Sequence, residues 1–169
     1  MATALLIARL IFGLGMAAHG AQKLFGWFGG YGIKGTGGFF ESLGYRPGTL
    51  FAAAAGLGEF GGGMLVAFGL GGPIGPALVI VVMLVAIFTV HWGHGFFVSK
   101  NGVELPLTYI SAMLLLMFFG SGAYSIDALL GLNAIWPVNA NWIVLGIAIL
   151  LALANLVVRR PAAQQPSAT

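Results

Sequence analysis

The chain has 169 residues, of which 59% are hydrophobic and only 7% are charged. A soluble domain carries about 25% charged residues, so this chain lacks the polar surface that water requires, and we expect it in a lipid bilayer. Its seven Lys and Arg residues are scattered, which argues against a nucleic-acid-binding surface, and the lack of cysteine excludes disulfides, thiolate metal sites and thiol relays.

The first apolar stretch, residues 4–25, predicts a membrane-spanning helix that is retained in the mature protein. No basic residue precedes this stretch, whereas a signal peptide has positive charge before its apolar segment. The Gly-rich residues 26–48 follow. Within them, Thr36 is expected to cap a short amphipathic helix at the membrane surface.

Three further apolar stretches predict helices over residues 49–70, 75–97 and 105–124. Each is long enough to cross the hydrocarbon core of a bilayer. Residues 4–124 are therefore expected to form a four-helix membrane core.

The second of these helices carries a ridge of small residues, Ala54, Gly58 and Gly62. Small side chains let helices approach closely in lipid, so this ridge and the adjacent Glu59 are expected to face a neighbouring helix. Ala67, near the end of the same helix, is expected to face lipid.

The C-terminal part differs from this core. Residues 125–141 are less apolar and are expected at the membrane interface. Residues 142–158 would span about 25 Å at 1.5 Å per residue, which predicts a fifth membrane helix. Residues 159–169 are expected to form a disordered tail. The predicted fold class is all-α integral membrane: a four-helix bundle plus a fifth, C-terminal transmembrane helix.

Basic residues are distributed unevenly across this arrangement. With five spans, six of the seven fall on one side of the membrane: Lys23, Lys34, Arg46, Lys100, Arg159 and Arg160. Only Arg9 lies toward the other side. Lys and Arg concentrate in cytoplasmic segments, so the C-terminus is predicted to be cytoplasmic and the N-terminus external.

Several ionisable side chains lie inside the predicted spans, where a charge costs about 2.5–3.5 kcal/mol on insertion scales. Helical spacing puts Arg9, His19 and Lys23 on one side of the first helix. At 1.5 Å per residue, His19 and His91 lie about 9 Å from the cytoplasmic ends of their helices, and Glu59 about 15 Å from the same side. These three are therefore expected to meet.

Three interpretations of this cluster remain open. Glu59, His19 and His91 would suit a catalytic site that takes protons from a quinol, with Arg9, Lys23 and Glu59 as ligand contacts. Arg9, about 24 Å from the cytoplasmic side by helical rise, would reach inward to Glu59 or extend outward. The same His and Glu side chains could hold a metal ion, or form a polar network that only joins the helices.

The order of several short motifs resembles that of the DoxX family of small bacterial membrane proteins. The matching segments are residues 9–13 (RLIFG), 19–20 (HG), 23–24 (KL), 35–36 (GT), 39–40 (FF) and 58–62 (GEFGG), with Ala86 and His91. The resemblance covers about residues 5–124. It implies a four-helix core in the bacterial inner membrane and an association with redox complexes.

Two functions follow as expectations. The chain would be the membrane subunit of a quinone-linked oxidoreductase, with quinone as a cofactor and a soluble or membrane redox protein as its partner. Alternatively, it would be a non-catalytic membrane anchor or assembly partner for a soluble oxidative-stress enzyme. In both cases the lipid bilayer surrounds it, and no nucleic acid is involved.

The five-span arrangement makes a direct prediction. Reporters fused after Lys100 and after Thr169 should both show cytoplasmic activity, because the basic residues hold these segments on that side. A paired cytoplasmic and periplasmic reporter assay measures this. A periplasmic signal at either fusion point would contradict the arrangement.

Overall fold

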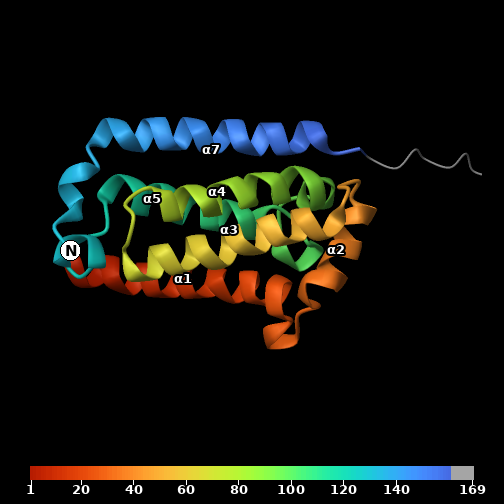
Figure 1. Cartoon of the computed structure of the whole chain (residues 1–169), viewed down its shortest axis with the longest axis horizontal. Helices are drawn as coiled ribbons and strands as arrows, with labels where there is room; N and C mark the ends of the chain where they lie inside the picture. The colour runs from red at the N-terminus through yellow and green to blue at the C-terminus, as the bar shows by residue number, and fades with distance from the viewer. Residues whose placement is uncertain (161–169) are drawn as a thin grey trace, which may run out of the picture.

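The computed structural model describes residues 1–160, and within that range it contains helices and no strand (Figure 1). The predicted all-α membrane fold is confirmed. The core consists of α1 (Ala2–Phe25), α3 (Gly48–Phe68), α4 (Ile74–Ala86) and α5 (Glu104–Phe119), which run alternately up and down. The fifth long helix, α7 (Val138–Val158), lies along the outside of the core against α4.

Short elements connect these helices. They are η1 (Trp27–Gly29), α2 (Gly32–Ser42), η2 (Ile87–His91), η3 (Trp92–His94), η4 (Val98–Lys100), α6 (Ile126–Leu129) and η5 (Leu132–Ile135). The η2 segment is a π-helical continuation of α4, and the combined helix Ile74–His94 is long enough to span a bilayer.

Among residues 1–160, four helical segments are long and apolar enough to cross a membrane: α1, α3, Ile74–His94 and α7. The remaining core helix, α5, is apolar but has only 16 residues. This length corresponds to about 24 Å at 1.5 Å per residue. Its C-terminal end falls at Phe119 rather than at the predicted Tyr124. Gly120 adopts a positive φ of 78°, and the chain then turns through residues 121–124.

The α1 and α3 helices pack so closely that their backbones touch. A Cβ atom added to Gly13 would lie 2.6 Å from the backbone nitrogen of Ala67, and one added to Gly63 would lie 2.6 Å from that of Ala17. Such distances leave no room for any side chain. Ala67 is accordingly buried in this contact, and the prediction that it faces lipid is wrong.

The other small-residue row of α3 faces α4, as the sequence predicts. A Cβ on Gly58 would lie 2.8 Å from Cγ2 of Val82, and one on Gly62 would lie 3.0 Å from Cβ of Leu78. The α3 helix therefore lies between α1 and α4 and presents a row of small residues to each. The row that faces α1 was not recognised from the sequence.

Thr36 does not cap a helix. The α2 helix begins at Gly32, four residues earlier, and Thr36 is buried in its middle. Its hydroxyl donates a hydrogen bond to the carbonyl oxygen of Lys23, 3.5 Å away. Thr36 thus joins α2 to the end of α1.

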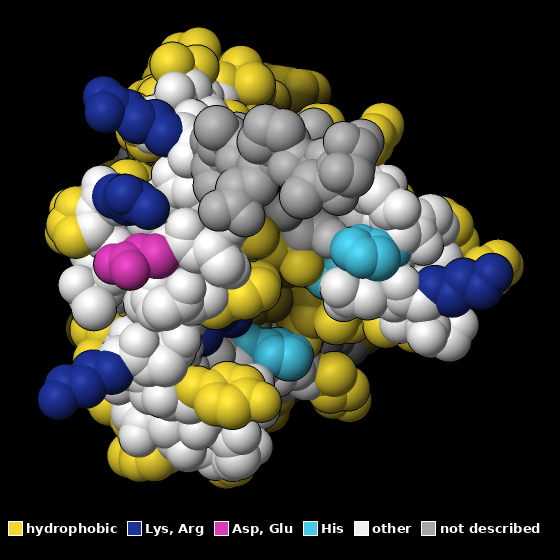
Figure 2. Space-filling model, turned by 90° about the vertical axis from the view of Figure 1, so that its right-hand side faces the viewer, with side chains coloured by type: hydrophobic (Ala, Val, Ile, Leu, Met, Phe, Trp, Pro, Cys, Tyr) yellow, Lys and Arg dark blue, Asp and Glu magenta, His cyan; other side chains and the backbone are white. Residues whose placement is uncertain are grey.

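Six basic residues gather at one end of the bundle, which we call the basic end. They are Lys23, Lys34, Arg46, Lys100, Arg159 and Arg160. Figure 2 looks onto this end and shows Lys and Arg side chains around a hollow with an apolar floor. The alternation of helix directions puts these residues together although they come from five different parts of the chain.

The expected C-terminal tail begins with two ordered residues. Arg159 donates from Nε to the carbonyl oxygen of Leu43 (2.6 Å). The backbone N–H of Arg160 donates to the carbonyl oxygen of Gly44 (2.9 Å). These bonds attach the end of α7 to the loop between α2 and α3. Residues 161–169, for which the sequence predicts disorder, lie outside the described residues.

The glycine contacts predict the effect of adding a single methyl group. Gly63→Ala should lower the midpoint of thermal unfolding, because the methyl group would push α1 away from α3. This overpacking should lower the free energy of unfolding by about 1–3 kcal/mol. Gly61→Ala is the matched control, since a Cβ there meets no atom within 4 Å. Alanine favours a helix over glycine by about 1 kcal/mol, so the control should be neutral or stabilising. Equal losses in detergent melting curves would contradict the contact.

Candidate functional site

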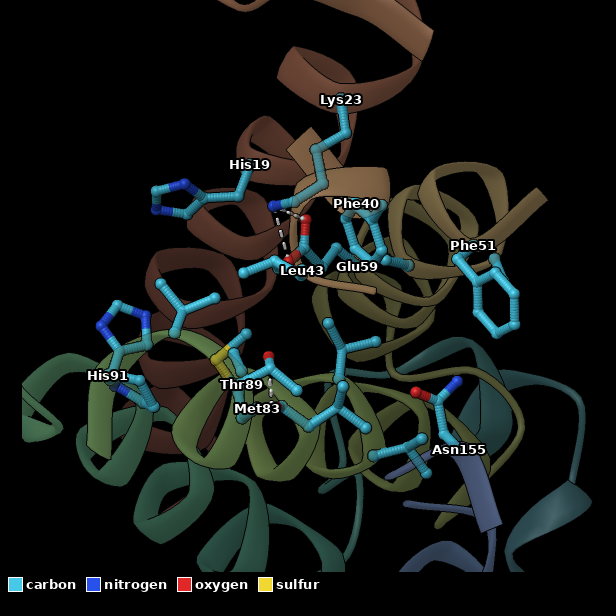
Figure 3. A pocket seen from close by; sticks show the side chains of 18 of the residues that line it. His19, Lys23, Phe40, Leu43, Phe51, Glu59, Met83, Thr89, His91 and Asn155 are labelled. Atoms are coloured by element: carbon cyan, nitrogen blue, oxygen red, sulfur yellow. Dashed lines mark hydrogen bonds and ion pairs between the residues drawn. The ribbon is translucent and has the colours of Figure 1, made fainter. Parts of the chain in front are cut away.

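A cavity of about 360 Å³ opens toward the basic end of the bundle (Figure 3). Its walls come from α1, α2, α3, the helix Ile74–His94, α5 and α7, and most of its lining is aliphatic or aromatic. The polar lining residues are His19, Lys23, Glu59, Thr89, His91, Tyr109 and Asn155. The cavity therefore offers a few polar groups within an apolar chamber, which is typical of a small-molecule site.

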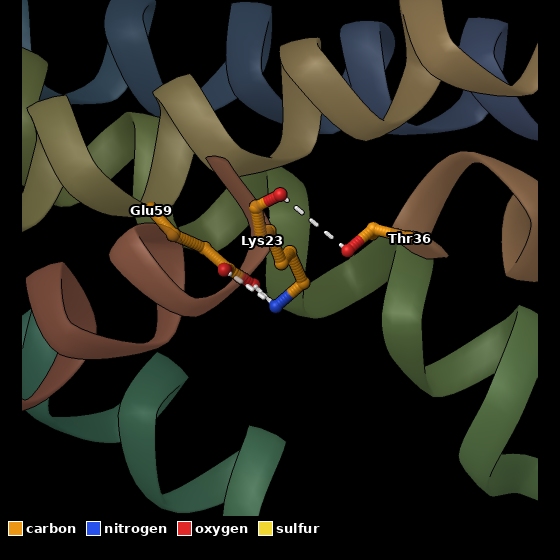
Figure 4. Close-up of polar contacts among 3 residues, drawn as sticks. All are labelled: Lys23, Thr36 and Glu59. Carbon is orange, nitrogen blue, oxygen red and sulfur yellow. Dashed lines mark hydrogen bonds and ion pairs between the residues drawn. The ribbon is translucent and has the colours of Figure 1, made fainter. Parts of the chain in front are cut away.

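Two of these polar residues, Lys23 and Glu59, form an ion pair (Figure 4). The Nζ of Lys23 lies 2.8 Å from Oε1 of Glu59 and 2.6 Å from Oε2. Glu59 is only 2% exposed, whereas the Lys23 side chain is 29% exposed. Lys23 thus supplies the counter-charge for a buried carboxylate, and its ammonium group keeps access to the cavity.

His19 lies one helical turn before Lys23 on α1. Its ring packs edge-on against the ring of Tyr109, with 6.4 Å between the ring centroids. Figure 3 shows His19 beside the Lys23–Glu59 pair. The α1 helix therefore brings an imidazole and an ammonium to the same wall of the cavity.

His91 reaches the cavity from η2, the π-helical part of the helix Ile74–His94. Its Nδ1 lies 2.7 Å from the carbonyl oxygen of Asn101. A carbonyl only accepts hydrogen bonds, so Nδ1 of His91 is the donor. In Figure 3, His19 and His91 lie on one side of the cavity, and Phe51 and Asn155 lie on the other.

Four of the five predicted site residues, His19, Lys23, Glu59 and His91, thus line one cavity. Within residues 1–160, no hydrogen bond joins either histidine to Glu59. The same residues contain no group of three or more His, Asp or Glu side chains positioned to hold a metal ion.

Arg9 lies far from this cavity, at the opposite end of the bundle. The sequence predicts that Arg9 reaches inward to Glu59 or extends outward, and the structure shows neither position. Its guanidinium is 2% exposed and donates to the carbonyl oxygens of Ser121 and Tyr124. These acceptors belong to the turn created where α5 ends at Phe119. Arg9 therefore joins α1 to that turn, and its position does not support a role in ligand binding.

Asp127 completes the polar cluster around Arg9. It is 0% exposed, and its carboxylate accepts hydrogen bonds from the backbone nitrogens of Gly71 (2.9 Å) and Gly72 (2.8 Å). Part of the segment 125–141, expected at the membrane surface, is therefore packed into the bundle. Backbone partners of this kind leave no pattern in the sequence.

Tyr109 and Asn155 were missed as lining residues. A tyrosine near one end of a span is common at membrane interfaces, so Tyr109 carried no distinct signal. Asn155 lies in the final turns of α7, and only the packing of α7 on the core brings it to the cavity. The polar residues of a spanning helix could have indicated Asn155, since they are costly in lipid.

Tyr45 supports the rim of the cavity at the basic end. It is 0% exposed, and its ring contacts Phe40 and Phe51, with centroids 5.8 and 4.8 Å apart. Burial raises the pKa of the Tyr45 hydroxyl, and the nearby charge of Arg159 lowers it by less. The hydroxyl therefore stays neutral at physiological pH. The ring contacts with Phe40 and Phe51 hold the loop between α2 and α3 against the cavity.

The fold and the cavity define a small multi-pass membrane protein with an ion-paired site toward one end of its helix bundle. Residues 4–92 match the sequence profile of the DoxX family, and the chain belongs to this family. The match contains His19, Lys23, Glu59 and His91, whereas Tyr109 and Asn155 lie beyond it.

A curated protein of Haemophilus influenzae, named only as an uncharacterized protein, is 32% identical to this chain over 63 residues. The similarity covers 37% of this chain and 40% of that protein, so the chain matches less than half of its relative's length. No solved structure is significantly similar to the chain.

The ion pair predicts a coupling between two substitutions. Lys23→Met should destabilise the protein by about 3 kcal/mol or more, because it leaves the Glu59 carboxylate buried without a counter-charge. Adding Glu59→Gln should recover part of this loss. Lys34→Met, at an exposed lysine on α2, is the control and should have little effect. Detergent melting curves measure these stabilities. A loss in the double variant equal to the sum of the losses in Lys23→Met and Glu59→Gln would contradict the pairing.

Proposed function

We propose that this protein is the membrane subunit of a redox complex and that its cavity binds the headgroup of a quinone. The observation that carries the proposal is the Lys23–Glu59 pair, which faces an apolar cavity beside two imidazoles and a phenol. Membership of the DoxX family supports it. The proposed location is the bacterial inner membrane, with the basic end toward the cytoplasm.

The residues suit the chemistry of a quinone. Its carbonyl oxygens accept hydrogen bonds, and Lys23, His19 and Tyr109 carry donor groups at the cavity wall. Reduction of a quinone to a quinol adds electrons and protons in equal number. Glu59 and the histidines are groups that can hold and pass protons, and the cavity opens toward water at the basic end.

The electrons are proposed to come from a partner protein. The chain has no cysteine and therefore no thiolate ligands for an iron–sulfur cluster. In this proposal the membrane subunit supplies the quinone site and the proton path, and its partner supplies the redox centre. The physiological donor would then dock at the basic end, close to the cavity.

A second function is that of a non-catalytic anchor for a soluble enzyme, and one surface feature favours it. The turn η1 projects from the bundle at the basic end (Figure 1). Its neighbourhood exposes large aromatic side chains: Trp27 (56%), Phe28 (71%) and Tyr31 (86%). Such a group could sit among lipid headgroups or contact a partner protein.

Glu59→Gln separates the two functions. Glutamine keeps most of the hydrogen-bonding capacity and the size of glutamate but cannot carry the proton. If Glu59 handles protons, the variant should reach normal membrane abundance and lose quinone-dependent activity by about 100-fold or more, as expected for a positioned acid–base group. His19→Gln and His91→Gln should show reduced activity in the same assay of the reconstituted complex.

Thr89→Val is the matched control for this series. Thr89 lines the cavity, but its hydroxyl is already bonded to the carbonyl oxygen of Val85 in its own helix (2.8 Å). Activity should therefore be unchanged. Normal activity in Glu59→Gln at normal abundance would refute the proton role and favour the anchor function.

A further inference from the structure

A second depression lies between α1 and α5, on the side of the bundle away from the basic end. Its volume is about 510 Å³. The lining is almost wholly apolar and comprises Met1, Ala4, Leu5, Ala8, Phe12, Thr108, Ser111, Ala112, Leu115, Leu116 and Phe119. Leu115 and Phe119 are each 60% exposed, so this groove is open at the lipid-facing surface.

The groove lies along the same face of α1 as the cavity. The cavity is lined by Lys23, His19 and Met16, and the groove by Phe12 and then Ala8. Intervals of three and four residues keep these side chains on one side of a helix. From His19 to Leu5 the helix rises about 20 Å at 1.5 Å per residue.

The α5 helix contributes the opposite wall in the same way. Tyr109 lines the cavity, whereas Thr108 and Ala112 line the groove. The linings of the two spaces adjoin at Phe12 and Tyr109, whose rings pack edge-on at a centroid distance of 5.8 Å. One seam between α1 and α5 thus changes from polar to apolar at this pair of rings.

We infer that the groove holds the isoprenoid tail of the quinone whose headgroup lies in the cavity, so the ligand is a polyprenyl lipid quinone. The inference rests on the proposed function. A ligand with a polar ring and a long apolar tail matches a seam that is polar at one end and apolar along the rest. Small residues, Ala8 and Ala112, leave the space for the tail.

The shape of the groove favours a chain over a helix as its occupant. A helix with its side chains is about 10 Å across, which is too wide for a groove of this volume to enclose along the length of α1. Phospholipid acyl chains would fit the apolar part alone. Only a ligand with a ring at one end uses the groove and the Lys23–Glu59 region together.

The test is to fill the groove without touching the cavity. Ser111 is exposed and lines only the groove, so Ser111→Phe should fold and obstruct the path of a tail. Thr108→Phe does the same nearer the cavity. Ala154→Phe, at an exposed position of α7 that lines neither space, is the matched control.

The probes are a polyprenyl ubiquinone and duroquinone, which has a quinone ring and no tail. Binding to the purified full chain in detergent is followed by quenching of tryptophan fluorescence. The wild type should bind the polyprenyl quinone at least about tenfold more tightly, a preference of about 1.4 kcal/mol. Ser111→Phe and Thr108→Phe should abolish the preference and leave duroquinone binding unchanged, and Ala154→Phe should keep it.

The outcomes separate this inference from the proposed function. If duroquinone binds and the groove variants retain the tail preference, the groove inference is overturned and the proposed function stands. Equal weakening of both ligands also overturns it, since the substitutions then act on the cavity. If neither quinone binds the wild type, the proposed function fails and the inference with it. A co-purified phospholipid that the groove variants lose, with quinone binding unchanged, would make the groove a lipid site instead.

Discussion

The close approach of α1 and α3 determines where the rest of the structure lies. Gly13 and Gly63 let the two backbones touch, and no side chain fits between them. This contact brings Lys23, near the end of α1, to Glu59 in α3 and makes their ion pair possible. A pair in lipid needs this precision, because a buried carboxylate whose partner is displaced is left without compensation.

The bilayer imposes a second constraint, which the protein meets differently at its two ends. At the basic end, Glu59 is compensated by another side chain, and both groups face a cavity. At the opposite end, Arg9 is compensated by the backbone carbonyls of Ser121 and Tyr124, and the hydroxyl of Ser121 donates to Asp127. A buried charge in a membrane helix therefore joins parts of the fold at one end of the bundle and lines an open cavity at the other.

The fifth helix also contributes to the site. Asn155 lines the cavity, and Arg159 holds the loop between α2 and α3 through the carbonyl oxygen of Leu43. The DoxX match ends at residue 92, so α5 and α7 lie beyond it, and both help to line the cavity. The walls of the cavity therefore include residues that the family match does not cover.

The sequence by itself determined the membrane environment, the order of the apolar helices and the end at which basic residues gather. These properties depend on composition, apolar length and the position of charge along the chain, all of which are local. It also predicted that His19, Glu59 and His91 lie at similar depth, because helical rise is constant, and the structure shows them lining one cavity. Only the tertiary structure decided that Lys23 pairs with Glu59, that Arg9 binds the turn after α5, and that Tyr109 and Asn155 reach the cavity. Those contacts join residues far apart in the chain, and several use backbone carbonyls or rows of small residues whose partners depend on how the helices pack.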